Sequence, residues 1–254
     1  MPYPKDLLST RAIVRHGQFA LIPPQGLVKN VIPGFVRSDI SILASPALGA
    51  NFAQYMVELL PQGGTDQRGF GGCGIATFAY CLGGEGQVRI RDRQESLRTH
   101  SFAYAPPSER MHLRNDAEAP MRVLLYRQRY RPLPGHSSEI VVGNAENIAA
   151  QVYDAMENVS VKDLLPSDLG FDFNMHILTF QPGGSHPFVE THVQEHGAYI
   201  LSGQGVYLID DEWIPVHKDD YIWFGPYVPQ AVYATGREDL SYVYSKDCNR
   251  DVEL

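Results

Sequence analysis

The sequence predicts an all-β protein made of two tandem jelly-roll β-barrels with a few short helices. Three observations favour this class: abundant turn-forming and aromatic residues, short apolar runs bounded by turns, and an internal repeat. The 254 residues include 23 Gly, 18 Pro, 14 Tyr and 11 Phe, and 44% of the chain is hydrophobic. A chain of this size can bury one large core or two small ones, and its turn formers favour short strands over long helices.

The repeat is visible in two pairs of landmarks. Leu82-Gly-Gly-Glu-Gly86 aligns with Leu201-Ser-Gly-Gln-Gly205, an offset of 119 residues (201 − 82). Tyr104-Ala-Pro-Pro-Ser108 aligns with Trp223-Phe-Gly-Pro-Tyr227 at the same offset (223 − 104). One offset shared by two landmarks more than twenty residues apart indicates equal loop lengths in the two halves, which predicts a duplicated β-domain.

The strands are expected in runs rich in β-branched and aromatic residues between turn residues, at residues 76–82, 198–203, 205–209 and 220–226. Each copy of roughly a hundred residues can close its sheets on itself as a barrel. A Pro/Gly/Ser-rich linker starts at residue 131, and short helices are expected at residues 146–156 and 161–165. We place the boundary within residues 131–150 and predict domains at residues 1–135 and 136–254.

Charge and cysteine content narrow the partners and the compartment. The net charge is −8 without a long run of like charges, which argues against nucleic acid because phosphate binding needs clustered Lys and Arg. Three cysteines form no metal-type pair, as expected for reduced thiols in a cytoplasmic protein. No apolar leader is visible at the start of the chain, and no stretch has transmembrane length. We therefore expect no membrane partner.

A cluster of ligand-type side chains lies at residues 190–196, with the sequence ETHVQEH. In a strand, alternate side chains share a face, so Glu190, His192 and His196 would point one way and Glu195 the other. A helical interpretation would pair the two histidines as in zinc proteases, but the flanking sequences are strand-like and Glu195 is not in the HExxH position. The alternative without a metal is that these side chains form the solvated polar face of an ordinary strand.

The spacing around this cluster resembles that of the two-domain cupins. Their first motif runs Gly, five residues, His-x-His, three or four residues, Glu, six residues and Gly. The chain has Gly184, Glu190-x-His192, His196 and Gly203 at these spacings, with the ligand types permuted. The second cupin motif starts at Gly, where this chain has Asp219, and it ends at Gln230 in place of a histidine. The resemblance thus implies the ligand set Glu190, His192, His196 and Gln230.

Within the cupins, the chain is similar to the (S)-ureidoglycine aminohydrolases, manganese-dependent bicupins of purine (allantoin) degradation. The similarity extends over nearly the whole chain, including residues 11–35, 171–183, 190–207 and 244–251. It implies one Mn²⁺ per chain, held by Glu190, His192, His196 and Gln230 in the C-terminal barrel. It also implies substrate contacts from Glu190, Tyr207, Tyr242 and Lys246, with catalytic roles for Lys246, Tyr242 and Glu190.

The donor types fit this expectation independently. Imidazole, carboxylate and carboxamide oxygen suit a divalent ion of intermediate hardness, Mn²⁺ or Fe²⁺, and no thiolate is near the motif to favour zinc. One carboxylate against a dication leaves the site net positive, which suits a small anionic substrate. Ligand types alone do not separate manganese from iron.

The N-terminal copy lacks these donors. At the 119-residue offset the four ligand positions are Gly71, Cys73, Thr77 and Met111, and His112 is one residue out of register, on the opposite face of a strand. We expect a metal-free, structural first barrel. Exposed strand edges make a homo-oligomer plausible.

For several other residues we prefer an ordinary structural role to a functional one. His176, His186 and His217 read as ordinary strand or loop histidines, and Cys248 has no base beside it in the sequence to make it a nucleophile. Two other functions stay open: an Fe(II) bicupin dioxygenase, since two histidines and a carboxylate are also an iron pattern, and a non-enzymatic cupin that binds a small metabolite.

Overall fold

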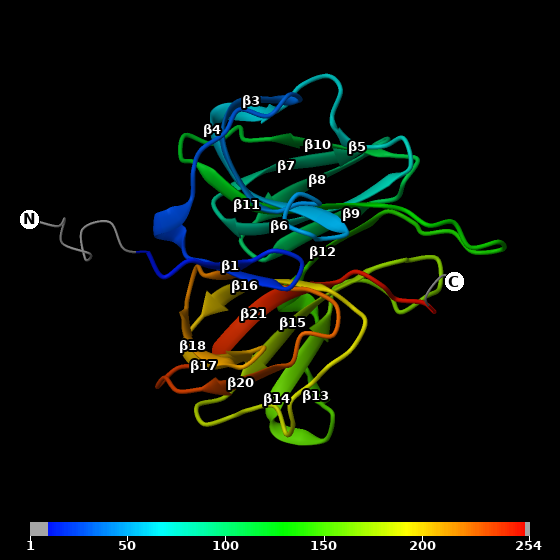
Figure 1. The fold of residues 1–254 in the computed structure, drawn as a ribbon. Helices are drawn as coiled ribbons and strands as arrows, with labels where there is room; N and C mark the ends of the chain where they lie inside the picture. Colours follow the sequence, from blue (N-terminus) through cyan, green and yellow to red (C-terminus); the bar gives the residue numbers. More distant parts are fainter. Residues whose placement is uncertain (1–9, 252–254) are drawn as a thin grey trace, which may run out of the picture.

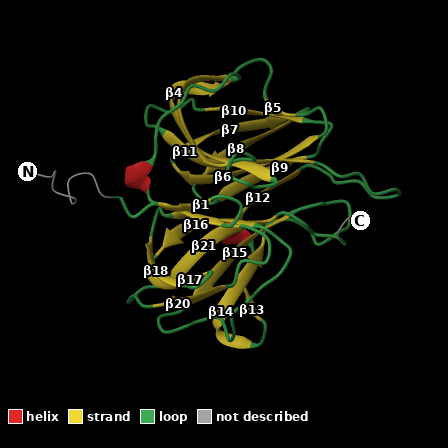
Figure 2. Cartoon of the chain, in the orientation of Figure 1, coloured by secondary structure: helices red, strands yellow, loops and turns green. Residues whose placement is uncertain are grey.

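The computed structural model describes residues 10–251, and in these the chain is almost entirely strand and turn. Two stacked barrels are visible in Figure 1, the first in blue to green above the second in green to red. The only helical elements in the described residues are two three-residue 3₁₀ turns, η1 (Pro24–Gly26) and η2 (Ala145–Asn147), drawn red in Figure 2. The all-β class is confirmed.

The upper barrel is one extended antiparallel sheet with strand order β12-β9-β6-β11-β4-β10-β7-β8, to which β3 and β5 add by pairing with β4 and β10. Its strands are β3 (Phe35–Ala44), β4 (Phe52–Thr65), β5 (Phe70–Gly71), β6 (Ile75–Gly83), β7 (Glu85–Ile90), β8 (Arg93–Arg98), β9 (Ser101–Ala105), β10 (Arg110–Arg114), β11 (Met121–Arg129) and β12 (Val141–Asn144).

The lower barrel has two sheets, in the orders β1-β2-β19-β16-β21-β15-β14-β13 and β18-β17-β20. Its strands are β1 (Ile13–Arg15), β2 (Phe19–Ile22), β13 (Gln151–Tyr153), β14 (Met156–Asp163), β15 (Asn174–Phe180), β16 (His196–Ser202), β17 (Gln204–Ile209), β18 (Glu212–His217), β19 (Tyr221–Phe224), β20 (Gln230–Ala234) and β21 (Leu240–Lys246).

The strands recur at the offset seen in the sequence. Adding 119 to the bounds of β7 and β8 gives the bounds of β17 and β18, with no difference at either end. By the same offset, β6, β9, β10 and β11 correspond to β16, β19, β20 and β21 within two residues. Sheet membership nevertheless crosses the predicted division at residue 135. Strands β1 and β2 pair into the lower barrel through β19, and β12 pairs with β9 of the upper barrel. The division itself stays a proposal.

The two predicted helices are wrong. Residues 146–156 contain only the end of η2, followed by β13 and a tight turn, while residues 161–165 continue β14 and then leave the sheet. Asn144 caps one turn by accepting a hydrogen bond from the Glu146 amide, but the β-branched and aromatic residues after it pair with the sheet edge instead. Asp154 and Ala155 both have positive φ, which closes a two-residue hairpin.

Three apolar clusters stabilise the molecule. One fills each barrel, and the third lies between them, where Phe52, Phe78 and Tyr126 of the upper barrel pack with Phe173 and Trp223 of the lower. This shared apolar cluster joins the two barrels. No helix in the described residues is long and apolar enough to cross a membrane. The predicted lack of a leader concerns residues 1–9, which lie outside the described range.

Candidate active site

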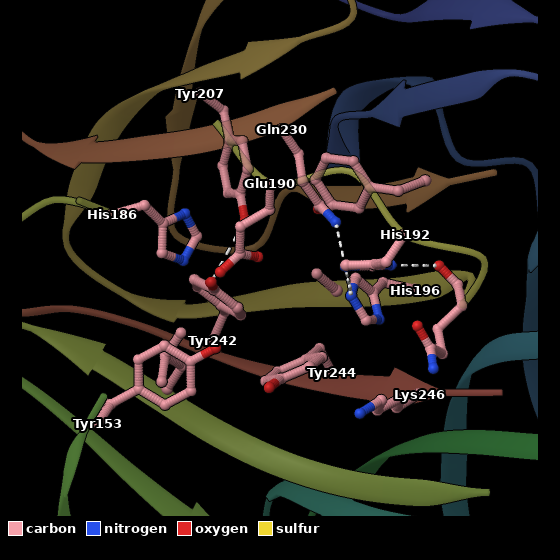
Figure 3. A pocket seen from close by; sticks show the side chains of 14 residues that line it. Tyr153, His186, Glu190, His192, His196, Tyr207, Gln230, Tyr242, Tyr244 and Lys246 are labelled. Carbon is pink, nitrogen blue, oxygen red and sulfur yellow. Dashed lines mark hydrogen bonds between the residues drawn. The ribbon is translucent and has the colours of Figure 1, made fainter. Parts of the chain in front are cut away.

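A cavity of about 130 Å³ lies inside the lower barrel, between its two sheets. The eight-stranded sheet contributes His196, Tyr242, Tyr244 and Lys246, and the three-stranded sheet contributes Tyr207 and Gln230. Figure 3 shows these side chains pointing toward a common space. All seven residues that the resemblance implied line the cavity: Glu190, His192, His196, Tyr207, Gln230, Tyr242 and Lys246.

The segment at residues 190–196 is not the continuous strand that we predicted. Residues 191–195 form a loop, and only His196 begins a strand. Glu190 is fixed by an isolated bridge in which its amide donates to the Gln230 carbonyl (2.8 Å) and the Gln230 amide donates to the Glu190 carbonyl (2.9 Å). The cavity still receives Glu190, His192, Gln194 and His196.

Glu195 points away from the cavity, as alternation predicted. Its carboxylate accepts hydrogen bonds from the Asn51 side-chain amide (2.7 Å), the Asn51 backbone N–H (3.1 Å) and Trp223 Nε1 (3.0 Å). Asn51 precedes β4 of the upper barrel, so Glu195 joins the two barrels. Burial, reinforced by the charge of Asp247, raises the pKa of Glu195 to about 7.

Two imidazoles and a carboxamide converge inside the cavity. Nε2 of His192 lies 3.2 Å from Nε2 of His196 and 3.0 Å from the Gln230 amide. Nδ1 of His192 is 3.0 Å from the Gln194 carbonyl, and Nδ1 of His196 is 2.8 Å from the Ser245 carbonyl. A carbonyl can only accept, so each Nδ1 carries the proton and each Nε2 presents a lone pair.

This arrangement fits a metal ion. Two lone pairs that face each other at 3.2 Å repel unless an electropositive atom lies between them, and ligands at right angles with bonds of about 2.1 Å lie about 3 Å apart. Histidines that bind metals usually donate their other N–H to a carbonyl or carboxylate, as both do here. Rotating the Gln230 carboxamide by 180° places its oxygen where the nitrogen stands.

Glu190 lies on another side of the cavity. Its carboxylate is hydrogen-bonded by Tyr153 and faces the Tyr207–Tyr242 side (Figure 3). Burial raises the pKa of Glu190, with a further contribution from Asp154. Within residues 10–251, no three side chains drawn from His, Cys, Asp and Glu lie together as a metal-binding group. The four-ligand set therefore stays a prediction.

Electrostatics keep both histidines neutral. Burial lowers the pKa of His192, and it lowers that of His196 to about 3 with the neighbouring His192 as the second cause. The hydroxyl of Tyr207 donates to that of Tyr242 across 3.2 Å. Both phenols are buried, which raises their pKa values, so they remain protonated donors at neutral pH.

Three residues with polar side chains that line the cavity were not predicted from the sequence: Tyr153, His186 and Tyr244. Tyr244 could have been found, because it alternates with Tyr242 and Lys246 along one strand face. His186 was predicted to be an ordinary strand or loop histidine, yet it is only 8% exposed and burial lowers its pKa to about 4. Tyr153 gave no sequence signal, since its segment was predicted to be helical.

Comparisons with known proteins fit this geometry. A Cupin domain family model matches residues 176–245. The chain is 51% identical over 253 residues to the (S)-ureidoglycine aminohydrolase of Escherichia coli, covering 99% of this chain and 97% of that protein. It is 30% identical over 245 residues to the (S)-ureidoglycine aminohydrolase of Arabidopsis thaliana, covering 95% and 79%.

Solved structures agree. The crystal structure of protein Ylba from E. coli matches with a TM-score of 0.88 at 50% identity, over 99% of this chain and 100% of that one. The putative glyoxylate-induced protein from Pseudomonas aeruginosa matches with a TM-score of 0.87 at 29% identity, over 98% and 94%. Bacillus subtilis oxalate decarboxylase, at 12% identity and a TM-score of 0.69 over 95% and 80%, shares the fold.

Proposed function

We propose that this chain, which belongs to the (S)-ureidoglycine aminohydrolase family and is thus a hydrolase of C–N bonds, converts (S)-ureidoglycine to (S)-ureidoglycolate and ammonia with Mn²⁺ in the lower barrel. The observation that carries the proposal is the convergence of His192 Nε2, His196 Nε2 and the Gln230 amide within 3.0–3.2 Å. The imidazole lone pairs and a Gln230 carboxamide oxygen suit a divalent cation, and the family suggests the substrate.

In the proposal, His192, His196, Gln230 and Glu190 would hold the ion. A bound divalent ion would supply Lewis acidity and orient the substrate and the attacking water. With one carboxylate against two positive charges, the occupied site stays net positive, which favours an anionic substrate. The neutral state of both imidazoles leaves them free to act as ligands at neutral pH.

The other cavity residues bind and orient the substrate. Lys246 lines the cavity at the end of β21 and pairs its ammonium with the substrate's α-carboxylate. Because Tyr207 donates its proton to Tyr242, the Tyr242 O–H is free to donate to the ureido oxygen. Glu190 accepts a proton from water on one carboxylate oxygen and returns it to the departing amine, so that ammonia leaves as the hydroxyl group is installed.

The proposal extends to the enzyme's cellular context. We infer that it is a cytoplasmic homo-oligomer of purine (allantoin) catabolism and has no nucleic-acid or membrane partners. A net charge of −8 opposes contact with phosphate backbones. Exposed apolar side chains at Val28 and Val31, 71% and 93% accessible in the single chain, support self-association on the upper barrel.

The test replaces Lys246 with Met, which removes the charge and keeps the length. We expect ammonia release from freshly generated ureidoglycine to fall by at least about a hundredfold, while elemental analysis still finds one manganese per chain. The matched control is Lys218→Met, at an exposed lysine outside the cavity, which should keep full activity.

Loss of manganese from the Lys246→Met protein would contradict the assigned role. Turnover of the unaltered enzyme under anaerobic conditions separates this function from the Fe(II) dioxygenase alternative, because a dioxygenase consumes oxygen. Ligand binding without ammonia release would favour the non-enzymatic cupin.

A further inference from the structure

The upper barrel contains a cavity of its own, of about 210 Å³. Its floor is apolar: Val57 and Leu125 are fully buried, and Tyr55 and Phe70 are 5% and 6% exposed. The floor belongs to β4, β5 and β11, which lie side by side with β10 in the upper part of Figure 1. The proposed aminohydrolase reaction uses none of these residues.

This cavity is the counterpart of the active-site cavity. Adding 119 to Gly71, Leu125 and Arg127 gives Glu190, Tyr244 and Lys246, and each of these pairs lines its own barrel's cavity. The upper barrel thus keeps a cationic side chain where the lower barrel has Lys246. The other positions that correspond to proposed metal ligands are Cys73, Thr77 and Met111, so a different chemistry is built around the retained cation.

Three guanidinium groups surround the cavity. Arg68 is neutralised by Asp66 at 2.7 Å, whereas neither Arg110 nor Arg127 has a carboxylate within ion-pair distance in residues 10–251. Two uncompensated positive charges therefore face one small space in a chain whose net charge is −8. Such a site attracts anions.

Both free guanidinium groups are held in place. Arg127 lies over the rings of Tyr55 and Phe70, with its Cζ 5.2 and 5.7 Å from their centroids. Arg110 donates to the Arg68 carbonyl at 2.9 Å and lies against Gly72, where a Cβ would come within 2.8 Å of its Cγ. Groups fixed before binding lose little conformational entropy when a ligand arrives.

We propose that this cavity binds a small organic carboxylate with an apolar body. Arg110 and Arg127 hold the carboxylate by charge-assisted hydrogen bonds, and the body packs on the apolar lining at Val57 and Leu125. Ureidoglycine and its hydrolysis product are polar along their whole length and do not match this floor. An apolar cavity of roughly 150 Å³ accommodates benzene, so about 210 Å³ accommodates a ring that carries a carboxylate.

Benzoate is the probe, and its affinity for the manganese-loaded enzyme is measured by calorimetry. Saturable binding is expected in the millimolar range, and uncharged benzamide should bind at least about tenfold more weakly. Arg110→Gln should weaken benzoate binding by about tenfold or more while leaving ammonia release and thermal stability unchanged. Arg127→Gln should have a similar effect on binding, with some loss of stability because its aromatic stacking is removed.

The matched control is Arg129→Gln, an exposed arginine on the same strand as Arg127 but outside the cavity lining, which should bind benzoate normally. The proposal is overturned if saturable binding is absent at about 10 mM or if benzamide matches benzoate. It is also overturned if benzoate binds Arg110→Gln as tightly as the unaltered enzyme, because the Arg110 guanidinium would then take no part in binding.

Discussion

Asp172 carries a carboxylate that is 4% exposed at the junction of the barrels. One oxygen accepts the Arg131 N–H at 2.9 Å, and the other has no partner in the described residues. Burial raises the pKa of Asp172 to about 6 from an ordinary 3.8. Between these two values the folded state binds more protons than the unfolded state, so this group stabilises the fold less as pH rises through that window.

Replacing Asp172 with Asn removes that dependence. The Asp172→Asn variant should gain stability relative to the unaltered protein as pH rises. The difference in their free energies of unfolding should be larger at pH 7.5 than at pH 4, by up to about 3 kcal/mol in favour of the variant. Urea titrations at the two pH values measure the difference, with Asp211→Asn as an exposed control that should show no trend. If the difference in free energy of unfolding between the two proteins were the same at both pH values, Asp172 would have the same pKa in the folded and unfolded states.

At the scale of elements, the hairpin β13–β14 contains backbone strain close to the candidate active site. Tyr153 pairs with Met156 across a turn whose central residues, Asp154 and Ala155, have φ values of 46° and 58°. An L-residue with a side chain adopts this region at a cost of roughly 1 kcal/mol, whereas glycine does so freely.

Ala155→Gly should therefore raise the free energy of unfolding by about 0.5–1 kcal/mol, measured by chemical denaturation. The control is Ala149→Gly, at an exposed alanine without positive φ, where added backbone freedom should destabilise slightly. Equal losses in both variants would show that the turn is unstrained.

The elements also show how far the sequence could lead. The 119-residue repeat predicted equal loop lengths in the two halves, and in the structure β7 and β17 differ by that offset at both ends. The ligand spacing predicted residues that line one cavity, since a bridge at Glu190 and a strand start at His196 fix their positions, but the Glu190 carboxylate is hydrogen-bonded by Tyr153 and lies apart from the two imidazoles. The helix predictions failed because sheet pairing at β14 overrides local propensity.

Other features depend on contacts that no local pattern encodes. The pairing of β2 with β19 joins residues about two hundred positions apart, and the hydrogen bond of Tyr153 to Glu190 depends on the hairpin that presents the tyrosine. Periodicity assigns a residue to a face, but it does not identify the element packed against that face. This is why Tyr244 was within reach of the sequence argument and Tyr153 was not.

For the whole molecule, we expect the apolar cluster between the barrels to govern unfolding. Phe173 is fully buried, and its ring centroid lies 4.8 Å from that of Tyr126 and 5.6 Å from that of Tyr104. Both tyrosines belong to the upper barrel, while Phe173 precedes β15 of the lower. Because β2 and β12 also cross the predicted domain division, we expect this packing to make the barrels unfold as one cooperative unit.

Phe173→Ala should lower the free energy of unfolding by about 3–5 kcal/mol, as expected for loss of a fully buried aromatic ring. Native-state hydrogen exchange should report the same reduction in β6 and β11 of the upper barrel as in β16 and β21 of the lower, since opening either barrel breaks the shared cluster. Phe188→Ala is the control, at a phenylalanine that is 59% exposed, and should change stability little. If β6 and β11 kept their full protection while β16 and β21 lost theirs, the barrels would unfold independently and the cluster would be only a contact between them.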